Sequence, residues 1–94
     1  MEKYIIIMLI PEEPYLIYYC GMQDGHPIMH EAAALVKQMT LKEAEETFKK
    51  FNPSKKDVTF CLIKWTKFVD IYQNIDFTKE TLIKESVKIK KGEL

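Results

Sequence analysis

Arginine is absent from this chain, and its fourteen basic residues are all lysine. The planar guanidinium of arginine is the group that proteins use most often to read guanine and to hold a phosphate through two hydrogen bonds. Fourteen acidic residues balance the lysines, so the formal net charge is zero. A protein built to bind nucleic acid typically has a strongly basic surface, so these features count against that class.

Glycine and cysteine are scarce, with three and two residues in the chain. Because the glycines are isolated, no glycine-rich loop is present to bind a nucleotide phosphate. Cys20 and Cys61 lie inside apolar runs, where reduced thiols behave as small hydrophobic side chains. A secreted domain of this size usually carries more cysteines, so we expect the protein in the cytoplasm.

Long apolar runs are also missing, and none approaches the roughly 20 residues needed to cross a bilayer. The apolar residues 4–10 are followed by Pro11-Glu12-Glu13-Pro14, which does not resemble a signal-peptide cleavage site. We therefore expect no membrane association. The 94 residues, of which 47% are hydrophobic, suit one domain over residues 1–94 with a core that needs no disulfide or metal.

Several runs that are present have the composition of strands. Residues 4–10, 15–20 and 58–65 are rich in β-branched and aromatic side chains, which predicts three strands. Gln23-Asp24-Gly25 is a turn signal, and the spacing of the first two strands predicts a β-hairpin. In residues 67–72, Val69 and Ile71 would lie on one face of a strand and Phe68, Asp70 and Tyr72 on the other, so we expect a fourth strand there or a bent continuation of the third.

The clearest helix signal begins at Thr40. Thr40 as N-cap with Glu43 three residues later forms a capping box, which predicts a helix that ends at Asn52-Pro53. The apolar face of this helix is expected to carry Leu41, Ala44, Phe48 and Phe51.

Two further segments fit both a helix and a strand. Over residues 27–39 the apolar spacing and three alanines favour a helix, with a short strand at 35–39 as the alternative. Thr78 as an N-cap favours a peripheral helix over residues 78–91, although alternation there also fits a strand. We predict an α+β fold: an antiparallel sheet of three to four strands packed by two to three helices.

No motif in the chain indicates catalysis or a cofactor. Cys20, His26 and His30 are the best metal candidates, since zinc binds thiolate and imidazole, but their spacing is weak and Pro27 interrupts the histidine pair. A Cys20 nucleophile is disfavoured because aromatic neighbours raise a thiol pKa. We therefore expect neither an enzyme nor a bound metal or cofactor.

Aromatic side chains exceed what one covered face of a sheet could hide, and exposed aromatic patches commonly mark partner sites. We expect a protein-binding surface, for another protein or for a second copy, to which acidic side chains add phosphate-like charge. Its expected residues are Glu12, Glu13, Tyr15, Tyr18, Tyr19, Glu31, Trp65, Phe68 and Tyr72.

The leading hypothesis is thus a small protein-binding module without catalysis. The abundance of lysine and isoleucine is typical of an AT-rich genome, so we picture an inhibitor of a host defence protein that is encoded by a phage or mobile element. The alternative is a single-stranded nucleic-acid-binding protein in which lysines surround a stacking tryptophan. Its expected residues are Lys55, Lys56, Lys64, Lys67 and Trp65.

Overall fold

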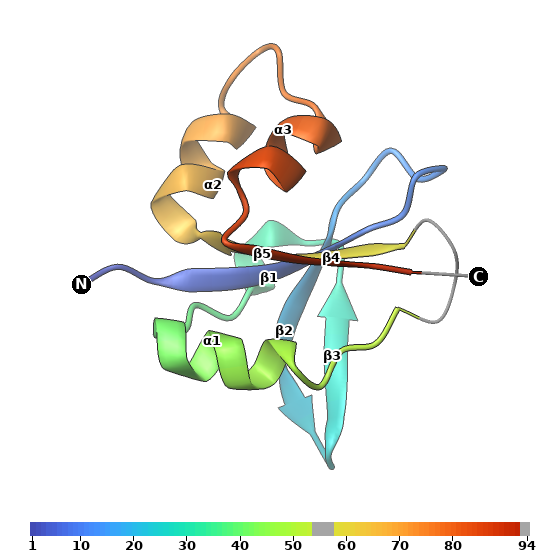
Figure 1. The fold of residues 1–94 in the computed structure, drawn as a ribbon, viewed down its shortest axis with the longest axis vertical. Coiled ribbons are helices and arrows are strands. Elements are labelled where there is room, and N and C mark those ends of the chain that lie inside the picture. The colour runs from blue at the N-terminus through green and yellow to red at the C-terminus, as the bar shows by residue number, and fades with distance from the viewer. Residues whose placement is uncertain (54–57, 93–94) are drawn as a thin grey trace.

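The strand β1, Tyr4–Leu9, lies at the centre of a five-stranded antiparallel sheet in the computed structural model, which describes residues 1–53 and 58–92 (Figure 1). Successive side chains of a strand point to opposite faces of the sheet. Because Ile5, Ile6 and Ile7 are all fully buried, both faces at β1 must be covered.

The sheet has the strand order β3-β2-β1-β4-β5, so the α+β class is confirmed while the predicted number of strands is too low. The other strands are β2 Ile17–Gln23, β3 His26–His30, β4 Thr59–Lys64 and β5 Lys88–Lys91. The helices are the short 3-10 helix η1 Ala33–Leu35 and the α-helices α1 Leu41–Phe48, α2 Trp65–Tyr72 and α3 Lys79–Glu85.

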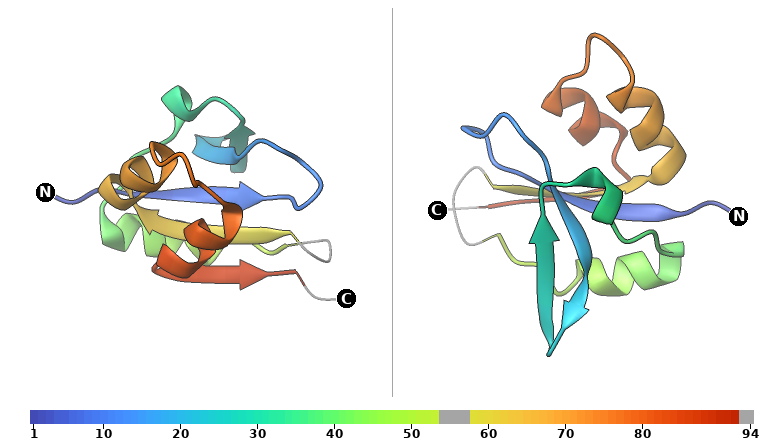
Figure 2. Two further views of the ribbon diagram at one scale, coloured as in Figure 1. Left: turned by 90° about the horizontal axis from the view of Figure 1, so that it is seen from above. Right: turned by 180° about the vertical axis from the view of Figure 1, so that it is seen from behind.

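Helices cover both faces of the sheet (Figure 2), with α1 on one side and α2 and α3 on the other. The chain therefore has two cores that share the strands. The α2/α3-side core includes Ile5, Ile7, Leu16, Tyr18, Cys61, Ile63, Phe68, Ile71 and Leu82. The α1-side core includes Ile6, Tyr19, Met39, Ala44, Phe48, Phe51, Phe60 and Leu62.

The predicted hairpin between the first two strands is confirmed, since β1 and β2 pair antiparallel. The predicted turn after β2 is also confirmed. Asp24 and Gly25 both have positive φ, at 53° and 79°, as a tight two-residue hairpin turn of type I′ requires. This turn brings β3 back beside β2, so the helix expected from Pro27 is wrong over β3. Pro27 is tolerated because β3 is an edge strand.

The predicted start of α1 at Thr40 is confirmed. The Thr40 hydroxyl accepts a hydrogen bond from the Glu43 amide at 3.2 Å. The Glu43 carboxylate pairs with Lys37 Nζ at 3.4 Å. Ala44 and Phe48 are buried as expected, whereas Leu41 is 39% exposed and does not belong to the buried face.

The strand predicted for residues 67–72 is wrong, because this segment belongs to helix α2. At the C-terminus each alternative is right in part. The Thr78 hydroxyl accepts from the Thr81 amide at 3.2 Å and caps α3, but this helix ends at Glu85. The chain then pairs with β4 as strand β5. Within the described residues, no helix is long and apolar enough to cross a bilayer.

Candidate partner-binding site

Three aromatic residues that were predicted to contact a partner are buried. Tyr18 and Phe68 are each 2% exposed, and their rings meet edge to face with centroids 5.7 Å apart in the α2/α3-side core. Tyr19 is 1% exposed and packs against Phe51 in the α1-side core. The prediction that these three rings lie on a surface is wrong, because helices cover both faces of the sheet.

The aromatic residues of α2 form a continuous row of rings. Trp65 lies 5.8 Å from Phe68, Phe68 lies 5.3 Å from Tyr72, and Tyr72 lies 5.6 Å from Phe77, measured between ring centroids. Trp65 is partly buried against the α2/α3-side core. Tyr72, which lies between Phe68 and Phe77 in the row, is 54% exposed and is the most exposed of the four residues.

A pocket of about 290 Å³ lies beside the start of β2 and the end of β3. Its lining residues are Tyr15, Ile17, Met29, His30 and Glu31. Two of them, Tyr15 and Glu31, were predicted as partner-binding residues. The structure thus brings together residues that the β2–β3 hairpin separates in the sequence.

The charge around this pocket is negative. The pKa of the Tyr15 hydroxyl is raised, first by the charge of Glu13 and by a hydrogen bond to that carboxylate, and to a smaller degree by burial and by the charge of Glu31. Among the described residues, no lysine or histidine forms an ion pair with Glu12, Glu13 or Glu31. These carboxylates are therefore available to a cationic partner.

Lys79 at the start of α3 holds the β1–β2 loop in place. Its ammonium donates to the Ile10 carbonyl oxygen at 2.6 Å and also to the Glu13 carbonyl oxygen. Because the ammonium is used on backbone oxygens, the loop is fixed without an ion pair to the Glu13 carboxylate. The same contact ties this loop to the segment that leads from α2 into α3.

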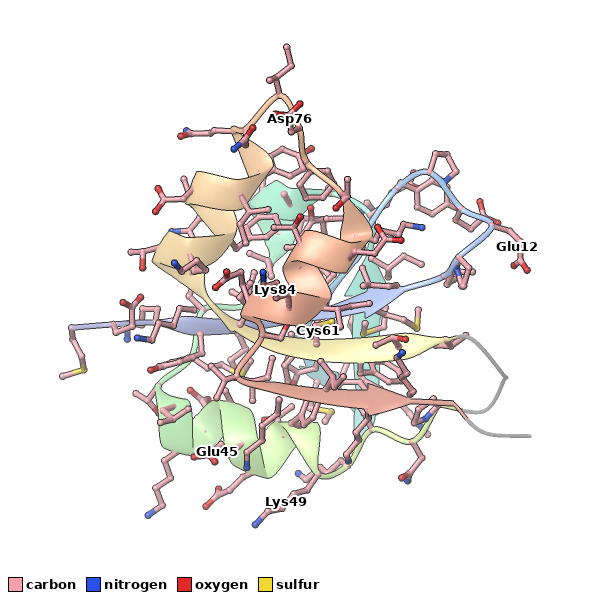
Figure 3. The ribbon with its side chains drawn as sticks, turned by 45° about the horizontal axis from the view of Figure 1, so that its top comes forward. Glu12, Glu45, Lys49, Cys61, Asp76 and Lys84 are labelled. Atoms are coloured by element: carbon pink, nitrogen blue, oxygen red, sulfur yellow. The ribbon has the colours of Figure 1, made fainter. Side chains whose placement is uncertain are left out.

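The α2–α3 loop and the β1–β2 loop lie on the same side of the sheet (Figure 3), as the labelled Asp76 and Glu12 show. Ile75 in the α2–α3 loop is 97% exposed. Ile75 was not among the predicted partner-binding residues, although its position between the polar residues Asn74 and Asp76 is a signal of exposure. The candidate site, called the loop face below, consists of Glu12, Glu13, Tyr15, Glu31, Tyr72 and Ile75.

The weak metal candidate is not supported by the backbone. His26 and His30 lie four residues apart on β3, which separates them by roughly 13 Å because a strand rises about 3.3 Å per residue. His30 Nδ1 accepts from the Ala32 amide at 3.0 Å, and the Cys20 thiol donates to the Tyr18 carbonyl oxygen at 3.4 Å. Within residues 1–53 and 58–92, no group of three His, Cys, Asp or Glu side chains is suited to a metal ion.

Burial raises the pKa of both thiols, at Cys20 and at Cys61. A nucleophilic cysteine requires the opposite shift, toward the thiolate at neutral pH. Neither thiol therefore has the environment of an activated nucleophile.

The lysines that were predicted to bind nucleic acid differ in their surroundings. Lys55 and Lys56 lie outside the described residues. Lys64 is exposed, and Lys67 Nζ lies 3.9 Å from the Glu85 carboxylate, which partly neutralises its charge. Trp65 is partly buried and packs against the Phe68 ring, so part of its indole ring is not available to a base. The described residues therefore give less support to a nucleic-acid-binding surface than the sequence did.

The chain matches no known family model, and comparison with curated proteins and with solved structures gives no match.

Proposed function

We propose that this chain is a small protein-binding module that acts by covering a basic surface of its partner, without catalysis. The observation that carries the proposal is the composition of the loop face. Tyr72 on α2 and Ile75 in the α2–α3 loop are exposed apolar side chains, and this loop lies on the same side of the sheet as the β1–β2 loop that carries Glu12 (Figure 3). Protein interfaces commonly combine an aromatic or aliphatic anchor with a polar rim.

The charge of the loop face indicates the kind of partner. Glu12, Glu13 and Glu31 have no ion-pair partner among the described residues, so a lysine- or arginine-bearing surface gains attraction without breaking an existing pair. Complementary charge of this kind raises the rate of association. Because salt screens the attraction between the charges, this gain is lost at high salt. We therefore expect the affinity of the module to fall as salt is added.

More specifically, we propose that the module is a cytoplasmic inhibitor, encoded by a phage or mobile element, that blocks a nucleic-acid-binding host protein. Two features support this more specific proposal. Carboxylates on the loop face can occupy positions where the host protein holds phosphates. The lysine-rich, arginine-free composition is typical of an AT-rich genome.

Capture from a bacterial lysate, followed by mass spectrometry and by binding measurements with the purified captured protein, tests the proposal. Tyr72→Ala and Ile75→Ser are the test variants. Leu41→Ala is the matched control, because Leu41 is also exposed but lies on α1 across the sheet. We expect the wild type and the control to hold the same protein and both test variants to lose it. Equal retention by all four, with intact circular dichroism, contradicts the proposal.

The nucleic-acid alternative is tested by titrating a fluorescent single-stranded oligonucleotide at low and moderate salt. The proposal expects no binding at low salt. Micromolar binding that weakens steeply with salt would replace the protein-binding proposal with the alternative.

A further inference from the structure

The Tyr15 pocket has both apolar and polar lining residues. The side chains of Ile17 and Met29 and the ring of Tyr15 contribute the apolar part, and Glu31 contributes a carboxylate. A site of this kind fits a ligand with a hydrocarbon stem and a cationic head, because the stem can pack while the head reaches an aromatic ring or a carboxylate.

His30 does not oppose such a ligand. Its Nδ1 accepts a hydrogen bond from the Ala32 amide at 3.0 Å, so this ring nitrogen is already engaged within the chain. The lining of the pocket contains no lysine, and Glu31 is its one carboxylate.

We propose that the pocket receives an arginine side chain of the partner protein, with the guanidinium over the Tyr15 ring and paired with the Glu31 carboxylate. This inference rests on the proposed protein-binding function. Arginine fits better than lysine because its planar guanidinium stacks on an aromatic ring and can pair with a carboxylate through two hydrogen bonds.

The occupant belongs to a different protein. This chain contains no arginine, so a second copy can offer only lysine to the pocket. The partner is therefore a separate, arginine-bearing protein, and self-association does not fill this site.

The test is an NMR titration of the full chain with the blocked tripeptide acetyl-Gly-Arg-Gly-amide. The lysine tripeptide and the citrulline tripeptide, in which the head group is similar in shape but uncharged, are the comparison ligands. We expect saturable shifts at the lining residues Tyr15, Ile17, Met29, His30 and Glu31. The arginine peptide should bind at least about threefold tighter than the lysine peptide, and the citrulline peptide should not saturate.

Variants assign the contacts. Glu31→Gln and Tyr15→Ala should each weaken arginine binding severalfold, while Tyr15→Phe should keep it because the ring remains. Glu46→Gln is the matched control, since Glu46 is an exposed carboxylate on α1 that does not line the pocket. The spectrum of each variant reports whether its fold is intact.

Three outcomes overturn the arginine site: shifts that rise linearly and spread over all acidic residues, equal binding of the lysine peptide, or equal weakening by Glu46→Gln. These failures differ from a failure of the proposed function. If the peptide does not bind but Tyr72→Ala and Ile75→Ser still lose the captured protein, the binding module stands and only the arginine pocket is removed.

Discussion

Lys90 on the edge strand β5 donates a hydrogen bond from Nζ to the carbonyl oxygen of Phe48, the last residue of α1, at 2.8 Å. The same ammonium donates to the Phe51 carbonyl oxygen at 2.9 Å and lies 5.2 Å from the centroid of the Phe48 ring. Carbonyl groups at a helix C-terminus have no intrahelical partner, and a cation there complements the helix dipole. Lys90 thus joins the last strand to α1.

Replacing Lys90 with methionine should lower the free energy of unfolding by about 1–3 kcal/mol, because the charged hydrogen bonds to two carbonyl groups are lost. Urea denaturation followed by circular dichroism measures the change. Lys91→Met is the control, since Lys91 is an exposed neighbour on the same strand. An equal loss in both variants would show that Lys90 acts only through the charge of the strand.

Replacing Lys79 with methionine should loosen the β1–β2 loop, because its ammonium is the donor to the Ile10 and Glu13 carbonyl oxygens. The Glu13 amide, which donates to Ile10 O at 3.0 Å, should exchange its hydrogen faster. Hydrogen exchange followed by NMR reports this directly. Lys84→Met on the exposed side of α3 should leave the loop unchanged, and unaltered exchange at Glu13 in Lys79→Met would refute the role of Lys79.

Replacing Gly25 with alanine should cost about 1–2 kcal/mol of stability, since an L-residue in the left-handed region is strained. The φ of Gly25 is 79°, and a Cβ there would meet no atom within 4 Å, so the cost is conformational and not steric contact. Gly25→Asn tolerates this region better and should lose less. Thermal unfolding of the two variants compares them, and equal losses would exclude the conformational explanation.

High pH should destabilise the fold through Tyr18. Burial raises the pKa of its hydroxyl to about 12, with a smaller contribution from Tyr72, while the unfolded chain ionises near the ordinary value of 10.0. The unfolded state therefore releases this proton first, so the stability that Tyr18 contributes is complete below pH 10 and falls between pH 10 and about 12.

Tyr18→Phe removes this titration. Its unfolding free energy should fall less steeply over the same pH range than that of the wild type, and the absorbance difference between the two proteins should show one tyrosinate that forms at about pH 12. A Tyr18 that ionises together with the exposed tyrosines would contradict its burial.

Local signals explain the part of the fold that the sequence predicted correctly. The Thr40 cap and the Asp24-Gly25 turn depend on hydrogen bonds and φ angles within a few residues, so sequence patterns suffice to find them. The strand β3 is different, because its alanine-containing neighbourhood favours a helix and only pairing with β2 makes it extended. Tertiary pairing outweighed local propensity there.

The sequence of helix α2 contains a helical pattern and a competing strand pattern. Trp65, Phe68, Val69 and Tyr72 have the spacing i, i+3, i+4, i+7, while Val69 and Ile71 alternate as in a strand. Over eight residues the two periods cannot be separated, and packing against β4 and α3 decides. The burial of Tyr18 follows from this, because α2 packs over it, while Tyr19 is covered in the α1-side core. The predicted exposed aromatic patch assumed helices on only one face.

The loop face could be predicted only in part for a related reason. Glu12, Glu13 and Tyr15 are adjacent in one loop, so their grouping follows from the sequence. Glu31 reaches Tyr15 only because β3 returns along β2, and that strand was not predicted. Ile75 was recognisable as an isolated apolar residue, but its exposure depends on how α2 and α3 pack.

The register of the central strand has a consequence for how the chain is made. Ile5 pairs with Ile63, so more than half of the protein is synthesised before β1 can meet β4. Until then β1 can form backbone hydrogen bonds only with β2. Its isoleucine side chains remain exposed in the nascent chain and can form non-native contacts. We expect the ribosome-bound chain to need protection over this interval, and the finished chain to fold more slowly than a helical bundle of its length.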